Sequence, residues 1–316
     1  MRRRRVTVFG GSGFIGRHLV NRLAARGDIV TVAVRDPEAA IFLKPMGDVG
    51  QIGIVAADIA NPASVAAAVR GADAVVNLVG ILWQWGRSSF SRIHAEGAGN
   101  VARAASAAGA THLVHISAIG ADAGGEAEYA RSKAVGEAAV REAFPKATIL
   151  RPSVVFGPED NFFNQFAELA RHLPALPVFG SGDGPRFQPV YVGDVADAIV
   201  VALGCAAAEG RAYELGGPRV YSFRQLMQLV LSEIGRQRPL LPIPLWLAGL
   251  AGWFLQILPQ PLLTRDQMLL LKRDNVIASG AATLTDLGII PTAAESVLPA
   301  YLRRFRRPQL RMPHAA

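Results

Sequence analysis

The chain of 316 residues has almost no cysteine: Cys205 is the single one, so no disulfide can form within the chain. Cys205 lies in an alanine-rich stretch, and we expect a small buried side chain there rather than a nucleophile. No apolar leader segment follows the N-terminal arginines, and together with the lack of disulfides this predicts a reducing, cytoplasmic location. The six histidines show no metal-ligand spacing, so we expect no metal site.

Between the two arginine-rich ends, the chain has almost no net charge. The formal net charge is +8, but nine arginines lie at the two ends, and without them the remainder carries −1. These nine are Arg2, Arg3, Arg4, Arg5, Arg303, Arg304, Arg306, Arg307 and Arg311. This distribution argues against a nucleic-acid-binding face, and we expect no nucleic acid partner. The basic ends fit an anionic membrane surface, an acidic protein partner or a solubilising role.

Long apolar runs are also scarce, with one exception at 240–258, which carries no charge. Pro242 and Pro244 break the start of this run, and Pro259 and Pro261 follow its end. The helix expected over about 245–258 is too short to cross a bilayer. It is either a core helix or an amphipathic helix that lies at a membrane interface or covers a substrate.

Strand-like and helical patterns alternate through the first half of the chain. Expected strands cover 6–9, 29–34, 52–55, 74–79, 113–117 and 148–150, and expected helices cover about 14–26, 62–70, 90–108 and 129–143. Short, continuously apolar strands are typical of a parallel sheet with helices on both faces. The sequence therefore predicts an α/β fold with a Rossmann-type, doubly wound parallel sheet.

The pattern changes after Arg151, where loops lengthen, prolines become frequent and helices dominate. We expect residues 1–151, with returning segments to about 200, to form a dinucleotide-binding domain. We expect residues from about 152 to 316 to form a smaller, mainly helical C-terminal lobe. This lobe would contain the apolar helix 245–258 and the basic tail, and would close over the edge of the sheet.

A glycine-rich turn follows the first strand, with Gly10, Gly13 and Gly16 in the spacing GxxGxxG. A turn without Cβ atoms lets the backbone approach a pyrophosphate, and the N-terminus of the following helix supplies N–H donors and a partial positive charge. We therefore expect a dinucleotide to contact this turn. The residues concerned are Gly10, Ser12, Gly13, Phe14, Ile15 and Gly16.

The residues that follow the second strand, Arg35 and Asp36, bear on which cofactor is bound. An NAD site usually presents a carboxylate to the ribose, whereas an arginine can bind the 2′-phosphate of NADP through two hydrogen bonds. Because Arg35 comes first after the strand, we expect NADP(H) to be preferred, with NAD(H) left open; the alternative is that Arg35 only faces solvent. Further cofactor contacts are expected from Asp58, Ile59, Leu78, Val79 and Gly80. Asp58 has the alternative role of capping the helix that begins near Pro62.

Tyr129 and Lys133 form a YxxxK pattern at the start of an expected helix and therefore share one helix face. An ammonium group close to a phenol lowers the pKa of that phenol. Tyr129 could then transfer a proton while hydride moves to or from a nicotinamide, and Lys133 could hold the nicotinamide ribose. The same spacing is also common on exposed helix faces. Trp83 and Trp85 either line an apolar substrate cavity or pack under the second lobe.

Taken together, these motifs resemble the extended or atypical branch of the short-chain dehydrogenase/reductase superfamily, which includes NAD-dependent epimerases and dehydratases. The resemblance is carried by 10–16, Asp58, 77–80, Asn100, Tyr129, Lys133 and Arg151-Pro152. It implies a catalytic set of Tyr129, Lys133 and Ser117, and further cofactor contacts from Pro152 and Val154. It also implies that Asn100 supports the active site through backbone contacts.

The chain departs from that family at Ile119, where the extended branch usually has a second Ser or Thr. That hydroxyl orients the substrate oxygen, and losing one such donor costs about 10²–10³ in turnover. The sequence therefore predicts cofactor binding and leaves open whether the protein turns over a substrate.

A narrower resemblance links the chain to the NADPH-binding accessory subunit family of respiratory complex I. It is carried by the runs 129–137, 143–145, 151–160, 162–166, 188–195 and 263–266. It implies a tightly held NADPH and complex I as a partner, near the membrane and the quinone site. Some relatives are linked to quinone biosynthesis. The protein would then lie in the cytoplasm or peripherally on the cytoplasmic face of the inner membrane.

Three functions remain as hypotheses. The first is a cofactor-holding protein of respiratory-complex or quinone-linked metabolism. The second is a stand-alone NADP-dependent oxidoreductase that acts on a hydrophobic carbonyl or quinone-like substrate through Tyr129 and Lys133. The third is a sugar-nucleotide epimerase or dehydratase, which ranks last because the second lobe shows no obvious diphosphate-binding group.

Overall fold

The computed structural model describes residues 3–86, 88–179, 184–243 and 264–306. The apolar run 245–258 and the last ten residues of the basic tail lie outside these ranges, so the predictions made for them stay predictions. Within the described ranges, the structure contains no helix that is long and apolar enough to span a bilayer.

The central sheet consists of seven parallel strands in the order β11-β6-β5-β4-β1-β2-β3. Their bounds are β1 (Arg5–Phe9), β2 (Ile29–Val34), β3 (Ile52–Ala56), β4 (Ala74–Asn77), β5 (His112–Ile116), β6 (Thr148–Pro152) and β11 (Ala212–Leu215). The strand order reverses between β1 and β4, and open α/β sheets bind ligands at such a switch point. The predicted Rossmann-type parallel sheet is confirmed.

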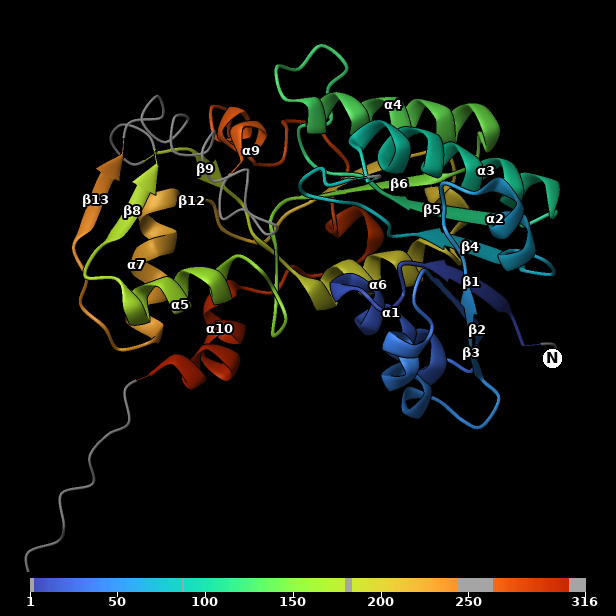
Figure 1. Cartoon of the computed structure of the whole chain (residues 1–316), viewed down its shortest axis with the longest axis horizontal. Coiled ribbons are helices and arrows are strands. Elements are labelled where there is room, and N and C mark those ends of the chain that lie inside the picture. Colours follow the sequence, from blue (N-terminus) through green and yellow to red (C-terminus); the bar gives the residue numbers. More distant parts are fainter. Residues whose placement is uncertain (1–2, 87, 180–183, 244–263, 307–316) are drawn as a thin grey trace, which may run out of the picture.

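Helices cover both faces of this sheet (Figure 1). One face carries α1 (Phe14–Ala25), α6 (Val192–Ala202) and the 3₁₀ helix η1 (Glu38–Met46); the other carries α2 (Pro62–Ala68), α3 (Ala98–Ala107) and α4 (Glu128–Ala143). Side chains alternate between the faces along each strand. On β1, Val8 packs in the core beneath α1 and α6, whereas Phe9 packs in the core beneath α2, α3 and α4. Two buried faces explain why the strand sequences are apolar throughout.

The helix expected over 90–108 is divided in two. Its first part is a π-helix, η2 (Ser91–Gly97), and the α-helix α3 follows it. π-turns in helices are rare and often lie at functional sites. The backbones of η2 and α4 touch at Gly136, where any Cβ atom would collide with the carbonyl oxygen of His94. The π-helix therefore places His94 directly beside α4.

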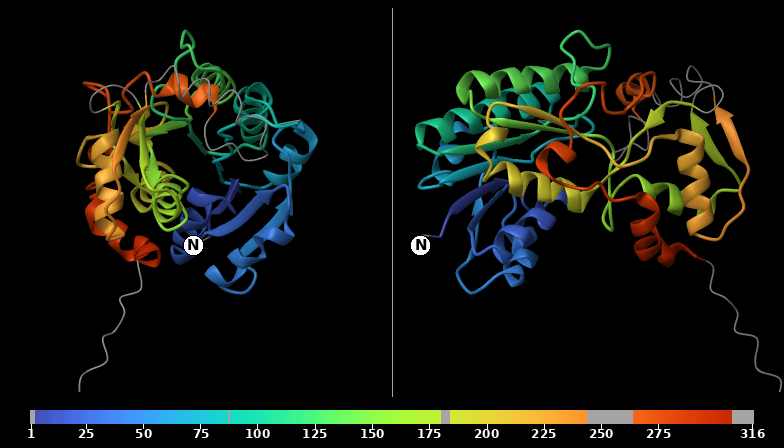
Figure 2. Two further views of the ribbon diagram at one scale, coloured as in Figure 1. Left: turned by 60° about the vertical axis from the view of Figure 1, so that its left-hand side comes forward. Right: turned by 180° about the vertical axis from the view of Figure 1, so that it is seen from behind.

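The second lobe lies at the carboxyl end of the sheet strands and has a hydrophobic core of its own (Figure 2). It contains α5 (Phe163–His172), β8 (Leu176–Phe179), α7 (Phe223–Glu233), β13 (Leu240–Ile243), α9 (Arg265–Leu270) and α10 (Ala294–Leu302). Four further strands form short ladders: β7 (Val155–Phe156) with β10 (Val190–Tyr191), and β9 (Arg186–Phe187) with β12 (Tyr221–Ser222). The described ranges also contain the short 3₁₀ helices η3 (Ala206–Ala208), η4 (Thr285–Leu287) and η5 (Arg303–Phe305).

The chain passes between the sheet and the second lobe more than once. After β8, it returns to the sheet as α6 and β11, so the returning segments reach Leu215. It then builds α7 and β13 in the second lobe, and α9 lies back against the N-terminal end of α4 (Figures 1 and 2). The second lobe therefore contributes residues to the same edge of the sheet as the glycine-rich turn.

Candidate functional site

The glycine-rich turn has the geometry that a pyrophosphate site requires. Gly10 adopts a positive φ of 77°, and its carbonyl accepts a hydrogen bond from the Gly13 N–H at 3.0 Å. A Cβ atom on Gly16 would lie 2.6 Å from the Cα of Gly11, so only glycine fits there. Gly13 is the N-cap of α1 and supplies no side-chain cap. The first N–H groups of α1 are thus available to an anion.

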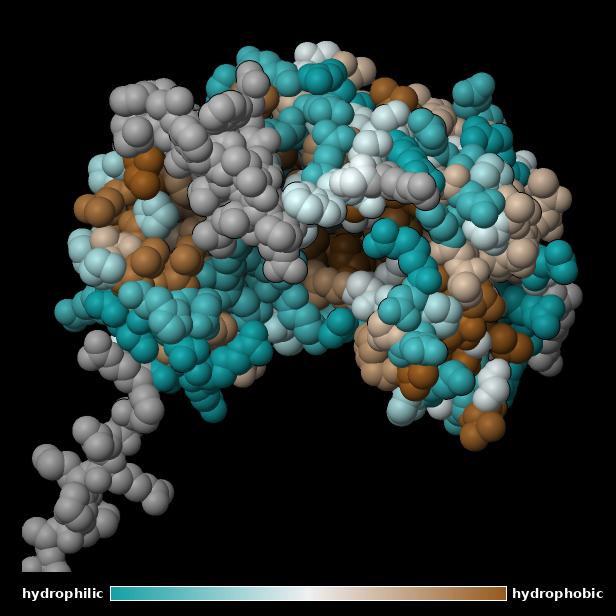
Figure 3. Space-filling view, in the orientation of Figure 1, coloured by the Kyte–Doolittle hydropathy of each residue, from teal (hydrophilic) through white to brown (hydrophobic). Residues whose placement is uncertain are grey.

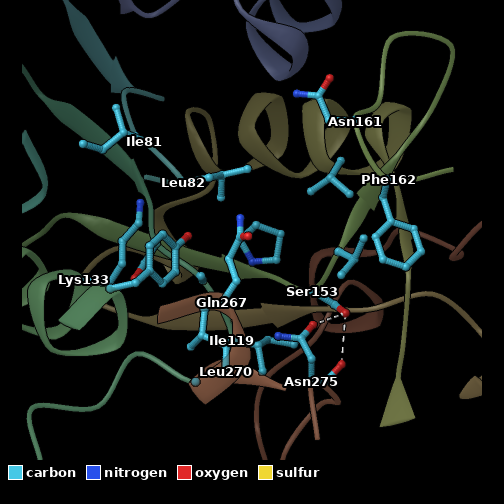
Figure 4. A pocket seen from close by; sticks show the side chains of 18 of the residues that line it. Ile81, Leu82, Ile119, Lys133, Ser153, Asn161, Phe162, Gln267, Leu270 and Asn275 are labelled. Atoms are coloured by element: carbon cyan, nitrogen blue, oxygen red, sulfur yellow. Dashed lines mark hydrogen bonds between the residues drawn. The ribbon is translucent and has the colours of Figure 1, made fainter. Parts of the chain in front are cut away.

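A cavity of about 1100 Å³ extends from this turn to the second lobe. Figure 3 shows the hollow between the two parts of the molecule, with apolar side chains at its floor. The predicted site residues that line it are Gly10, Gly13, Phe14, Ile15, Gly16, Leu78, Gly80, Ser117, Tyr129, Lys133, Pro152 and Val154. Of the two tryptophans, Trp83 lines the cavity and Trp85 is exposed. The second lobe adds residues that include Phe162, Gln267, Leu270 and Asn275 (Figure 4).

The other predicted cofactor contacts, Ser12, Arg35, Asp58, Ile59 and Val79, do not line this cavity. Arg35 is exposed at the end of β2. Its neighbour Asp36 accepts the Ala39 N–H at 3.1 Å and so caps the start of η1. The Asp36 carboxylate, which would repel a 2′-phosphate, thus accepts a hydrogen bond from the backbone of the following turn.

The loop after β3 is held by its own hydrogen bonds. Asp58 accepts the Ala60 N–H at 2.9 Å, and Asn61, not Asp58, caps α2. Asn100 donates to the carbonyl of Ile59 at 2.9 Å. Asn100 therefore supports the loop after β3 through a backbone contact. The contact with Tyr129 comes from His94 in the preceding π-helix η2.

Tyr129 and Lys133 both line the cavity from the first turns of α4. Figure 4 shows Lys133 there. The Lys133 Nζ lies 5.9 Å from the centroid of the Tyr129 ring and donates to the Ile116 carbonyl at 3.3 Å. Burial lowers the pKa of the Lys133 ammonium to about 8. Burial, with a smaller effect of the Asp266 carboxylate, raises the pKa of the Tyr129 phenol to about 12. The net lowering of that pKa that the YxxxK spacing predicted is therefore not found in this geometry, where burial raises it.

Ser117 follows β5 and faces the same cavity. Its hydroxyl oxygen is buried and has no hydrogen-bond partner among the described residues. A buried hydroxyl without a partner costs free energy, so it is a natural contact for a bound ligand. Ile119 also lines the cavity, with its N–H bonded to the Pro152 carbonyl at 3.1 Å. The wall at this position is thus apolar, as the sequence indicated.

His94 is a site residue that the sequence analysis missed, because it treated the histidines only as metal ligands. The His94 ring lies edge-to-face with Tyr129 at 5.3 Å between centroids. Its Nε2 accepts the Ile81 N–H at 3.0 Å, and its Nδ1 lies 2.9 Å from Ser132 Oγ. Burial, then the neighbouring Lys133, lower the pKa of His94 to about 3. A neutral imidazole therefore supports the Tyr129 ring.

Asp266 is a second residue whose position only the structure shows. Its carboxylate accepts the N–H groups of Glu128 and Tyr129 at the start of α4. The sequence run 263–266 contributed to the resemblance above, but nothing in the sequence connects it to α4. Among the described residues, no cluster of three or more His, Cys, Asp or Glu side chains is arranged to hold a metal ion.

Comparison with known proteins shows the family. Residues 6–216 match the NAD dependent epimerase/dehydratase family. The chain is 33% identical to the mitochondrial NADH-ubiquinone oxidoreductase 40 kDa subunit of Neurospora crassa, covering 95% of this chain and 79% of that protein. It is 34% identical to the mitochondrial NADH dehydrogenase [ubiquinone] 1 alpha subcomplex subunit 9 of Mus musculus, covering 95% and 80%.

One further relative and one solved structure are also similar to the chain. The chain is 30% identical to ceramide reductase of Caulobacter vibrioides, covering 76% of this chain and 73% of that protein. The fold is similar to that of DesIV, a dTDP-glucose 4,6-dehydratase from Streptomyces venezuelae whose crystal structure holds NAD and TYD. That likeness has a TM-score of 0.73 at 22% identity and covers 95% of this chain and 96% of that chain. By its sequence match, its sheet order and its glycine-rich turn, the protein belongs to the NAD dependent epimerase/dehydratase family.

Proposed function

We propose that the protein binds NADP(H) tightly in this cavity and serves respiratory-complex or quinone-linked metabolism, as a relative of the complex I accessory subunits. The observation that carries the proposal is the match to those subunits over 95% of the chain, which includes the second lobe and not only the nucleotide-binding part. The partner would be complex I, and the protein would lie peripherally on the cytoplasmic face of the inner membrane.

The residues present fit a dinucleotide. The turn from Gly10 to Gly16 would bind the pyrophosphate through backbone N–H groups. Lys133 and Tyr129 would hold the nicotinamide ribose, and the unpartnered Ser117 hydroxyl faces the same space. When bound, the cofactor supplies the hydride for a two-electron reduction.

Two arginines favour NADP(H) over NAD(H). Arg35 is exposed after β2, beside an Asp36 carboxylate that already caps η1. Arg17 lies over the Phe42 ring at 5.0 Å, and its buried Nε has no hydrogen-bond partner among the described residues. A 2′-phosphate that reached either guanidinium group would receive charge-assisted hydrogen bonds.

The cofactor preference is tested by titrating the purified protein with NADPH and NADH. Arg35→Glu should weaken NADPH binding about 10-fold or more, since hydrogen bonds to charged groups contribute about 1.5–3 kcal/mol, and should leave NADH binding within about twofold. Arg70→Glu, at an exposed arginine that does not line the cavity, is the matched control. Equal loss of both cofactors, or no loss, would contradict the assignment of Arg35.

The accessory role is tested in native membranes. Mild solubilisation and a native gel, probed for this protein, should show co-migration with complex I and a nucleotide that exchanges slowly. Migration as a small free species would overturn the proposed partnership while leaving cofactor binding intact.

A second candidate, a stand-alone reductase of hydrophobic carbonyl or quinone-like substrates, is favoured by an apolar wall of the cavity. That wall includes Ile81, Leu82, Ile119, Leu269 and Leu270. Two cations that line the cavity are engaged in ion pairs: Lys272 pairs with Glu126 at 2.8 Å and Arg273 with Asp122 at 2.9 Å. Such a wall suits an apolar substrate better than a sugar nucleotide, which ranks last. The similarity to a ceramide reductase points in the same direction.

In this second role, Tyr129 would donate its hydroxyl proton to the substrate carbonyl as hydride arrives, and Ser117 would donate a second hydrogen bond to the same oxygen. A phenol whose pKa is raised to about 12 keeps its proton at neutral pH, which suits reduction. Tyr129→Phe should abolish NADPH oxidation with apolar ketones and quinones without removing the cofactor, which the glycine-rich turn and Lys133 would still hold. Undiminished oxidation in that variant would refute the role of Tyr129.

A further inference from the structure

The helix that carries Tyr129 and Lys133 has no cap of its own. The N-cap of α4 is Ala127, in an extended conformation with φ −76° and ψ 132°, and it supplies no side-chain hydrogen bond. The first N–H groups of a helix have no partner within the helix and need an acceptor from elsewhere. Ser, Thr, Asp and Asn are the preferred N-cap residues because their side chains can provide it.

For α4 the acceptor comes from the second lobe. Asp266 Oδ1 accepts the Glu128 N–H at 2.6 Å, and Asp266 Oδ2 accepts the Tyr129 N–H at 3.0 Å. Asp266 lies in the first turn of α9, 137 residues after Tyr129. A carboxylate at a helix N-terminus is also favoured by the helix dipole.

We propose that Asp266 is a positioning residue of the site: by capping α4 from the second lobe, it ties the placement of Tyr129 to the docking of α9 over the cavity. A ligand that touches α9 would then act on the start of the helix that carries Tyr129. The capping of α4 by Asp266 is independent of the proposed function; the role of Tyr129 in binding or proton transfer rests on that function.

The surroundings of α9 support this coupling. The start of α9 is itself fixed, because Thr264 and Gln267 form a reciprocal capping box. Gln267, Leu269 and Leu270 line the cavity, so one face of α9 meets the ligand space while Asp266 meets α4.

Two ion pairs join the residues after α9 to the loop before α4, Lys272 to Glu126 and Arg273 to Asp122. All four side chains are exposed, and exposed ion pairs contribute little. The two hydrogen bonds of Asp266 are therefore the main polar connection between α9 and α4.

Amide hydrogen exchange at Glu128 and Tyr129 tests the proposal on the full chain, without cofactor or turnover. In Asp266→Ala these two amides should exchange about 5- to 30-fold faster, the change that corresponds to losing a helix cap. Glu126→Gln, which removes an exposed ion pair at the same contact, should leave their exchange within about twofold. Unchanged exchange in Asp266→Ala would overturn the proposal.

A rescue variant separates capping from general loosening of the fold. Ala127→Ser places a hydroxyl at the N-cap of α4, where it can accept one of the free N–H groups. Added to Asp266→Ala, it should reverse at least half of the increase in the logarithm of the exchange rate at these two amides. If the double variant exchanges as fast as the single one, Asp266 does not act as the cap.

Ionisation of Tyr129 gives an independent readout, which a merely structural role would not move. Lys133 and His94 contact its ring, the Asp266 carboxylate bonds its backbone N–H and acts on the phenol through its charge, and Glu128 precedes it in α4. The Asp266 charge opposes the phenolate, so Asp266→Asn should shift the Tyr129 titration to lower pH, measured as tyrosinate absorbance minus that of the Tyr129→Phe counterpart. An unshifted titration would contradict contact between the two residues.

Because neither the exchange experiments nor the titration uses NADPH or complex I, their failure is distinguishable from failure of the proposed function.

Discussion

Replacing Arg151 with methionine removes the partner of a buried carboxylate on α4. The Glu137 side chain in α4 is only 3% exposed, and Arg151 in β6 holds it through two hydrogen bonds, at 2.8 Å and 2.6 Å. The pair joins the helix that carries Lys133 to the sheet. Arg151 also lies 3.8 Å from Glu214, so its loss leaves two carboxylates without their nearest cation.

The expected cost follows from the burial of this pair. Breaking a buried pair by removing one partner destabilises a protein by about 3–5 kcal/mol, because the remaining charge is buried without compensation. The Arg151 side chain is 27% exposed, and Arg141 stays 3.6 Å from Glu137. We therefore expect the lower end of that range, about 3 kcal/mol in the free energy of unfolding.

Urea unfolding of the full chain measures this change. Arg171→Met is the matched control, since Arg171 pairs with Glu168 on the surface, with side chains 41% and 47% exposed. That variant should lose less than about 1 kcal/mol. The double variant Arg151→Met/Glu137→Met should be more stable than Arg151→Met alone, because it removes the unpaired charge of Glu137, the more deeply buried of the two carboxylates. The reasoning fails if Arg151→Met costs no more than Arg171→Met.

Three further outcomes follow from the site. Gly16→Ala should abolish NADPH binding in a fluorescence titration, because its Cβ would meet the backbone of the turn; Gly53→Ala, whose Cβ would meet nothing closer than 4.0 Å, should bind normally. The pKa of Lys133 is lowered from its usual value of 10.5 to about 8 in the folded protein. Between these two pH values Lys133 is protonated in the unfolded chain and neutral in the folded one. Stability relative to Lys133→Met should therefore rise with pH across that interval, and a flat difference would argue against a buried lysine. The pKa values of His94 and His115 are lowered to about 3, so stability should fall as pH drops from about 6.5 towards 3. The combined variant His94→Asn/His115→Asn should show a shallower acid slope in thermal unfolding, and an unchanged slope would assign the acid loss to other groups.

The sequence by itself determined the features that depend on neighbouring residues. Short apolar strands such as 29–34 must be covered on both faces, and that pattern predicted the parallel sheet. The spacing of Gly10, Gly13 and Gly16 predicted a turn whose tight contacts the structure contains. The start of α4 lies within one residue of the predicted position, and Tyr129 and Lys133 share its cavity face.

Tertiary structure alone decided how those residues behave chemically. The pKa of Tyr129 depends on burial and on a carboxylate 137 residues away, and no local spacing reports either. His94 reaches Tyr129 through a π-helix, which shifts side chains away from the α-helical periodicity that sequence patterns assume. The cap of α4 comes from α9, because an N-terminal N–H bonds to whichever acceptor the packed lobes bring within reach. Periodicity and turn chemistry act over a few residues, whereas burial and long-range hydrogen bonds exist only once the second lobe has packed against the sheet.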